Sequence, residues 1–571
     1  MAKRISQETF DSVVGENVTD FEMTPEEALA DAIKQFKSQG VDLNNVDTTG
    51  GIGRFELMEA IALVKSGTLE VMSKALATLS EICDEAHEYS QRNLSITNSN
   101  GCIHAISLLI ALPIEHTNIV LSAIKLLTKL CKAHVENRDH FEPGGCDKLS
   151  KFISAEVTRA LEKSYCCTSL IAALELARVV AKTEYNKSML MAWKVGELLV
   201  KILNVENDRE LDTEWLQVLL LACHTVRGLC VHDDFRKDMS CAYDNGKYFI
   251  SADVMAFLLH YSRQFQQYPA LAAAALSAAK QMITTEEAVK VAAHHGAMDL
   301  PIAVLSWSDS SLSLIRSVAG VMRNLCADDI RKDRLVADGS MALLVAALSS
   351  DKFSVDFTFC EHALACLAAM SLRSPSNSEK IMNCGAAEII VQSMRKYPDK
   401  GALQRQACLS VRNIAARCPE FRNTLLDAGV ETVLRTAGRL QDSVDEAYGA
   451  LRDLGCEVQY VKVSKDGKIE SAYESFGVKS KLQFNPVYDD APDIEDRINS
   501  EAHAPFEGQL TERFDDADDG ENGTSCNNTV FSSIPFSDIS KEQSSVDFGH
   551  DHMHSHAHDH GSSSCCSANC N

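Results

Sequence analysis

The sequence predicts an all-α solenoid, in which helical repeats stack along the chain and bury a continuous core between them. Three observations support this prediction. Leu, Ala and Val recur at helical spacing through most of the 571 residues, of which 45% are hydrophobic. Glycines open comparable segments at regular intervals, and each segment also contains a longer amphipathic stretch. A period in the mid-forties built only of helices is typical of repeat arrays.

The N-terminal segment, residues 1–43, predicts a helical cap. Thr24 begins a capping box and is followed by a proline at the first helical position, so we expect a helix from about Pro25 to Gln39. The segment is expected to cover the hydrophobic edge of the first repeat. The alternative is a helix that docks separately on a partner. A linker at 44–54 leads into the repeats.

The repeat array is expected over residues 55–462, in about nine units. The turn between the first and second helices of a unit needs positive φ or close backbone approach, which favours glycine. The gap of 101 residues between Gly145 and Gly246 is expected to hold two units, one of which has its glycine replaced near Lys194. The glycines that open segments are Gly101, Gly145, Gly246, Gly296, Gly339, Gly385 and Gly429.

Two stretches carry a resemblance to a known family. RNLCADDIRKDRLVADGSMALLVAAL (323–348) and SVRNIAARCPEFRNTLLDAGVETVL (410–434) resemble armadillo repeats. The opening, residues 3–43, together with ALRDLGCEV at 450–458, resembles the armadillo repeat-containing protein 6 family, whose biochemistry is poorly defined. The resemblance covers residues 3–460. It implies a right-handed superhelical solenoid whose third helices line a concave groove.

The resemblance also implies a binding site. In armadillo arrays, asparagines late in the third helix can hydrogen-bond the backbone of an extended peptide. We call the aligned position the ladder position, and Asn324 and Asn413 occupy it here. Basic residues stand at or directly before it in most units and form what we call the basic stripe: Lys129, Arg178, Arg227, Lys280, Arg323, Arg412 and Arg452.

We predict that the basic stripe binds an extended acidic ligand, because arginine offers bidentate bonds to carboxylates and phosphates. The alternative is that these cations pair with carboxylates of neighbouring repeats. Importin alpha has a similar architecture but places tryptophans one turn before the ladder asparagines, where this chain has Gly320 and Leu409. A basic nuclear-localisation signal is therefore not the expected cargo.

Two details recur between repeats. DDFRKD (233–238) and DDIRKD (328–333) precede expected first helices, so their aspartates are predicted N-caps. Cysteines stand two residues after four ladder positions and are predicted to fill one small buried slot: Cys83, Cys131, Cys230 and Cys326.

Charge and composition exclude several classes of function. The net charge is −25, and residues 489–571 carry 18 acidic residues against 3 basic ones, so binding to nucleic acid or an anionic membrane is not expected. No apolar run reaches membrane-spanning length and no secretory signal opens the chain. The 20 cysteines are predicted to be free thiols. We expect a monomer in the cytoplasm, with the nucleus as a second location.

The chain shows no catalytic motif and calls for no cofactor, so we predict a non-enzymatic scaffold that binds a protein or peptide client. Residues 463–571 are expected to form a disordered acidic tail, whose acids at 489–521 could occupy the basic stripe. The tail ends in alternating histidines beside Cys565, Cys566 and Cys570. Zinc, nickel or copper could bind there adventitiously, and the second hypothesis is a metal-responsive or metal-delivery adaptor. These histidines are His550, His552, His554, His556, His558 and His560.

Overall fold

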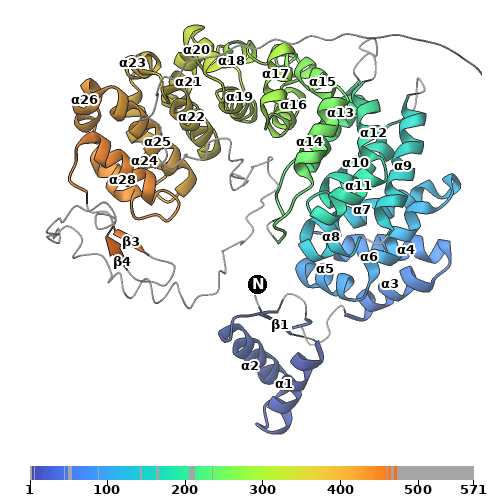
Figure 1. The fold of residues 1–571 in the computed structure, drawn as a ribbon. Helices are drawn as coiled ribbons and strands as arrows, with labels where there is room; N and C mark the ends of the chain where they lie inside the picture. The colour runs from blue at the N-terminus through green and yellow to red at the C-terminus, as the bar shows by residue number, and fades with distance from the viewer. Residues whose placement is uncertain are drawn as a thin grey trace, which may run out of the picture. The chain divides into compact units, whose positions relative to one another are not determined.

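The computed structural model confirms the all-α armadillo-repeat solenoid (Figure 1). Its acidic tail, predicted to be disordered, lies outside the described residues except for the end of one strand and a second strand of three residues. The structure describes residues 3–5, 7–43, 46–48, 54–87, 89–141, 144–161, 166–204, 212–234, 236–458, 461–463 and 469–471.

The N-terminal segment forms a helical hairpin of α1 (Gln7–Thr19) and α2 (Pro25–Ser38). The predicted capping box is confirmed, because the Thr24 side chain accepts the Glu27 N–H while the Glu27 carboxylate accepts the Thr24 N–H. The rings of Phe10 and Phe36 lie 5.9 Å apart in a core separate from that of the repeats. Covering of the first repeat by this hairpin therefore stays a prediction.

Four short strands accompany the helices. Strands β1 (Lys3–Arg4) and β2 (Val41–Asp42) pair in parallel beside the hairpin. After the last repeat, β3 (Val461–Val463) and β4 (Ile469–Ser471) pair antiparallel, with Lys462 opposite Glu470.

The third helix of each repeat packs against the third helix of the next, so these helices form one uninterrupted row. Their small and branched apolar side chains supply most of a single core that runs through the repeats. The third helices are α4 (Leu69–Ile82), α7 (Thr117–Ala133), α10 (Thr168–Val180), α13 (Thr213–Leu229), α16 (Pro269–Met282), α19 (Leu312–Leu325), α22 (Phe357–Ser371), α25 (Gly401–Arg417) and α28 (Val444–Leu454).

First and second helices flank this row. The first helices are α5 (Ser90–Ser99), α8 (Val135–Asp139), α11 (Glu184–Ala192), α14 (Ala242–Ser251), α17 (Glu286–His294), α20 (Asp329–Ala337), α23 (Pro375–Asn383) and α26 (Arg422–Asp427). The second helices are α3 (Arg54–Ser66), α6 (Cys102–Leu108), α9 (Gly145–Ala160), α12 (Val195–Leu203), α15 (Val254–Ser262), α18 (Leu300–Leu305), α21 (Ser340–Ser349), α24 (Ala386–Lys396) and α27 (Val430–Ala437). Three 3-10 turns lie at Leu109–Ala111, Ile114–His116 and Pro419–Phe421.

A residue with positive φ lies between the first and second helices of every repeat that has both. Lys194, predicted to replace a glycine, holds φ 69°. Two predicted positions were wrong. Gly144, not Gly145, holds the turn before α9, and Gly246 lies inside α14 while Asp253 makes that turn with φ 61°. The five other predicted glycines are confirmed in the left-handed region: Gly101, Gly296, Gly339, Gly385 and Gly429.

The linker is anchored to the first helix of the next repeat. Asp47 Oδ1 accepts a hydrogen bond from Arg92 Nη1 on α5 at 3.1 Å, and both side chains are buried. No single helix among the described residues is long and apolar enough to cross a membrane. The bent pair Ser90–Ser99 and Cys102–Ala111, which turns by 75°, reaches that length and composition only when its two parts are counted together.

Candidate partner-binding face of the third helices

All residues of the basic stripe lie on third helices, near their C-terminal ends. Lys129 is on α7, Arg178 on α10, Arg227 on α13, Lys280 on α16, Arg323 on α19, Arg412 on α25 and Arg452 on α28. Because the third helices pack in one row, these side chains recur at the same position of successive third helices. α4 and α22 contribute no cation, since Ser80 and Glu81 stand at the aligned positions of α4, and Ala368 and Ala369 at those of α22.

The two ladder asparagines bond to the array itself. Asn324 Nδ2 donates to the carbonyls of Lys280 and Ile283 at 2.9 and 3.0 Å, at the end of the preceding third helix. Asn413 Nδ2 donates to the carbonyl of Ala368 at 2.8 Å in the same way. Their amide N–H groups therefore hold neighbouring repeats together.

Several cations of the stripe also have carboxylate partners within the array. Lys129 Nζ lies 2.6 Å from Asp84 Oδ2, and Arg323 Nη1 lies 3.7 Å from Glu361 Oε1. Arg412 and Arg452 both face Asp453, at 3.6 and 2.9 Å. The alternative raised from the sequence, pairing between repeats, thus describes part of what these residues do.

A second row of arginines was missed from the sequence. Arg316 on α19 pairs with Asp356, the N-cap of α22, and Arg405 on α25 donates to Glu446 on α28 at 2.8 Å. Each precedes its stripe arginine by seven residues, so both lie on the same face of their helices. This repeated spacing was the signal that could have revealed them.

Gly320, one of the two positions compared with the importin alpha tryptophans, is covered by the Lys280 side chain of the preceding third helix. A Cβ on Gly320 would lie 2.5 Å from Cδ of Lys280, whose stem crosses this part of α19. A Cβ on Gly449 of α28 would lie 3.2 Å from Nε of Arg412. At both positions the absence of a side chain lets a cation of the preceding third helix lie against the helix surface.

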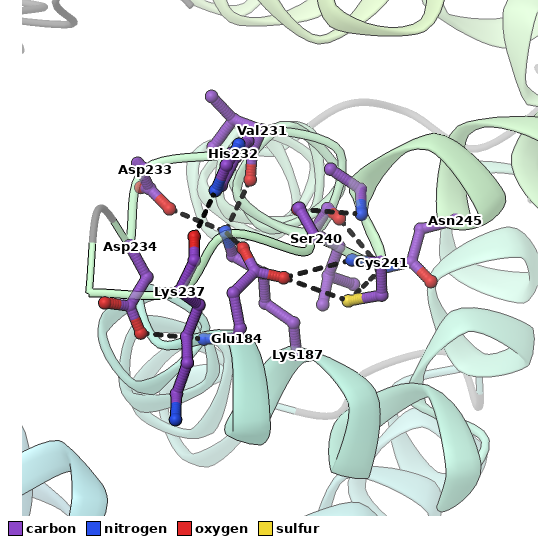
Figure 2. Close-up of polar contacts among 12 residues, drawn as sticks. Glu184, Lys187, Val231, His232, Asp233, Asp234, Lys237, Ser240, Cys241 and Asn245 are labelled. Carbon is purple, nitrogen blue, oxygen red and sulfur yellow. Dashed lines mark hydrogen bonds and ion pairs between the residues drawn. The ribbon is translucent and has the colours of Figure 1, made fainter.

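A polar cluster joins repeats along the first helices (Figure 2). Lys187 on α11 is fully buried, and its Nζ donates to Glu184 at 2.9 Å, to Asp233 at 2.6 Å and to the carbonyl of Val231. Burial alone would lower the pKa of Lys187, but these two carboxylates outweigh it and raise the pKa above 10.5. Glu184 also accepts the backbone N–H of Cys241 at 3.1 Å.

An arginine extends this cluster to a third repeat. Arg236 Nε donates to Asp234 at 2.8 Å, and its two terminal nitrogens bind Asp139 of α8 at 2.7 and 3.2 Å. Asp234 in turn accepts the backbone N–H of Glu184 at 3.2 Å. Residues 231–234 and 236–241 thus join α8, α11 and α14, and their ion pairs and hydrogen bonds stabilise the fold.

These contacts correct one prediction about the aspartate motifs. Asp328 is the N-cap of α20 and accepts the N–H of Arg331 at 3.0 Å, as predicted. Asp233 and Asp234 do not cap α14, which begins only at Ala242. They bind Lys187 and Arg236 instead, because the longer segment before α14 carries them back over α11.

The predicted cysteine slot is confirmed, since all four side chains are buried. Burial raises the pKa of Cys83 to about 11 and that of Cys131 to about 12, so neither thiol is poised as a nucleophile. Within the described residues, no group of three or more His, Cys, Asp and Glu side chains could hold a metal ion. The histidines 550–560 lie outside these residues.

Comparisons with known proteins confirm the resemblance predicted from the opening segment and ALRDLGCEV. The family model of the Armadillo repeat-containing protein 6 N-terminal domain matches residues 2–51. The chain is 26% identical over 409 residues to Armadillo repeat-containing protein 6 of Homo sapiens, which spans 67% of this chain and 76% of that protein. It is 27% identical over 396 residues to the Drosophila melanogaster homolog, spanning 67% of this chain and 81% of that one. A designed armadillo repeat protein of known structure superposes with a TM-score of 0.36 at 18% identity, covering 45% of this chain and 98% of its own.

Proposed function

We propose that this chain, which is similar to Armadillo repeat-containing protein 6, is a non-enzymatic scaffold that binds an extended acidic segment of a protein client along its third helices. Armadillo-type repeats present a long row of equivalent positions, and this geometry suits the binding of an extended peptide. No catalytic role is proposed for any residue.

The observation that carries this proposal is the recurrence of cations at one position of successive third helices. Arg323 and Arg412 are 27% and 36% exposed, so each is open to solvent on one side while an internal carboxylate lies on the other. Both internal contacts are longer than a hydrogen bond, and a guanidinium has five N–H donors. Such side chains retain the capacity to bind ligand carboxylates.

The contacts of Arg323 with Glu361 and of Arg412 with Asp453 decide which substitutions can test binding. Charge reversal at Arg323 or Arg412 would change stability as well as binding, because each side chain lies beside an internal carboxylate. Reversal at Arg323 would place two carboxylates beside each other in a partly buried site, which is destabilising. Glutamine removes the charge without this repulsion.

The test is the affinity of the full chain for a fluorescent polyglutamate peptide. We expect the double variant Arg323→Gln, Arg412→Gln to bind roughly tenfold or more weakly, since each charge-assisted hydrogen bond is worth about 1.5–3 kcal/mol. The control is Lys151→Gln, Lys290→Gln, which removes two exposed cations from α9 and α17. Equal affinity of both double variants, or no binding by the wild type, would refute the acidic-ligand proposal.

A further inference from the structure

Residues 46 and 47 belong to two packed regions at once. Val46 is 1% exposed and lies in the core of the N-terminal hairpin together with Phe10 and Phe36. The next residue, Asp47, is 3% exposed, and its carboxylate accepts the hydrogen bond from Arg92 on α5 at 3.1 Å. Because neighbouring Cα atoms are only about 3.8 Å apart, the hairpin core and α5 approach each other at this point.

The repeat array holds Arg92 in position for this contact. Its Nε and Nη2 atoms donate to Asn93 Oδ1 at 3.0 and 2.9 Å, and its guanidinium lies 4.6 Å from the centre of the Tyr89 ring. Asn93 Nδ2 in turn donates to the carbonyl of Ile82, at the end of α4, at 2.6 Å. Contacts within the first two repeats therefore fix the arginine, and Asp47 supplies a carboxylate to it from outside them.

α5 is more deeply buried than the other first helices. Its residues 92–97 are six consecutive buried residues. In the other first helices no more than two consecutive described residues are buried, as in α20, whose buried residues are Lys332, Leu335 and Val336. Side chains point to all sides of a helix within about four residues, so a helix with one face in solvent exposes some residue in every turn. α5 is therefore covered on the face that the other first helices leave open.

The position of α5 in the array indicates which segment covers it. Among the described residues no first helix precedes α5, since the first repeat consists of α3 and α4. The later first helices each follow another first helix. At α5 the ion pair brings residues 46–48 to the helix, and the side chains of Arg92 and Asp47 are only 8% and 1% exposed.

We propose that residues 46–48 are a latch that fixes the N-terminal hairpin to α5, so that the hairpin caps the array while the latch is closed. Hairpin and array have separate cores, so the latch can open without unfolding either of them. Opening returns both charges to water, whereas one of them buried without the other is strongly unfavourable. The ion pair therefore forms and breaks as a unit. It decides between the two roles raised from the sequence, a fixed cap and a separately docking helix.

Amide hydrogen exchange of the full chain, followed by mass spectrometry, tests the latch. Asp47→Asn removes the charge and keeps the size of the side chain. We expect the amides of α5 to exchange at least tenfold faster than in the wild type, because the open form becomes more populated. The amides of α1 and α2 should keep their protection, since the hairpin retains its own core, and those of α19 to α25 should not change. Asp47→Glu keeps the charge, so its α5 amides should exchange more slowly than those of Asp47→Asn.

The matched control is Asp31→Asn, which removes an exposed acid of α2 and changes the net charge equally. We expect it to leave the exchange of α5 unchanged. The same acceleration in both variants would show that the charge of the hairpin, not the ion pair, protects α5, and the latch would be refuted. Unchanged exchange of α5 in Asp47→Asn would refute it as well. Acceleration spread evenly over all repeats would assign Asp47 to global stability and overturn the proposal.

Discussion

At the scale of single residues, the turns between first and second helices show backbone geometry overriding residue preference. Lys194 and Asp253 adopt φ values of 69° and 61°, the region that glycine occupies at the other turns. A residue with a Cβ pays roughly 1–2 kcal/mol for this conformation. Stacking of the repeats therefore fixes the turn, and glycine is the residue that fits it with least strain.

Gly339 and Gly246 allow the two roles of glycine to be separated by one substitution. Neither glycine has a neighbouring atom within 4 Å of an added Cβ, so alanine changes only the backbone preference. We expect Gly339→Ala, at φ 93°, to lower the free energy of unfolding by about 1 kcal/mol. Gly246→Ala lies within α14 and should raise it by about 0.5–1 kcal/mol. Urea denaturation followed by circular dichroism measures both, and shifts of the same sign would contradict this account.

At the scale of elements, buried lysines on first helices join consecutive repeats. Lys187 of α11 and Lys332 of α20 each follow an acid by three residues, and each donates to a backbone carbonyl just after a third helix, Val231 and Leu372 respectively. Val231 follows α13 and Leu372 follows α22, so each carbonyl lies where the third helix of the lysine's own repeat leads into the next repeat. The two lysines differ in their carboxylates. Lys187 binds Glu184, which is 8% exposed, whereas Lys332 binds Asp329, which is 60% exposed.

The difference in exposure of Glu184 and Asp329 predicts that removal of the two lysines lowers stability by different amounts. Lys187→Met leaves the buried Glu184 carboxylate without its cation, and we expect the free energy of unfolding to fall by about 3–5 kcal/mol. Lys332→Met leaves a solvated carboxylate, so its thermal midpoint should fall less. Differential scanning calorimetry of the two variants tests this order. A larger loss for Lys332→Met would show that the carbonyl contact, not the ion pair, dominates.

The same cluster predicts how stability depends on pH. Burial raises the pKa of Glu184, but the charge and hydrogen bond of Lys187 outweigh it and hold the pKa below 4.5. A lowered pKa contributes stability above the unfolded value, and this contribution is lost as the pH falls through the folded value. The wild type should therefore lose more thermal stability than Glu184→Gln between pH 6 and pH 3, so that their melting temperatures converge in acid. Parallel curves would contradict this assignment.

Element type, repeat period and the position of most turns could be predicted from the sequence, because helical periodicity and glycine spacing are local signals. The placement of Asp233 could not, since its partner Lys187 lies 46 residues away and the segment between α13 and α14 is longer than in other repeats. Glu361 was also missed. It lies 3.7 Å from Arg323 of the preceding third helix, and no local pattern predicts which side chains the stacking brings together.

At the scale of the whole molecule, the row of third helices couples stability to recognition. Arg323 and Arg412, which are proposed to contact the client, each lie beside a carboxylate of the following third helix. They therefore also join α19 to α22 and α25 to α28. Stability in a repeat array is approximately a sum of repeat and interface terms. Binding variants must therefore be compared at matched thermal midpoints.

The acidic stretch at 489–521 belongs to the same chain as the basic stripe, and this predicts intramolecular competition. Covalent attachment raises the effective concentration of a weak ligand, up to the millimolar range for short connections and less for long ones. If this stretch occupies the basic stripe, a chain truncated after residue 462 should bind the polyglutamate peptide more tightly than the full chain. The gain should shrink as salt is added, because screening weakens partly exposed charge pairs. The matched control is a chain truncated after residue 546, which lacks the histidine-rich end but keeps the acidic stretch, and it should bind like the full chain. Equal affinity of all three chains at low salt would exclude autoinhibition and leave the scaffold proposal unchanged.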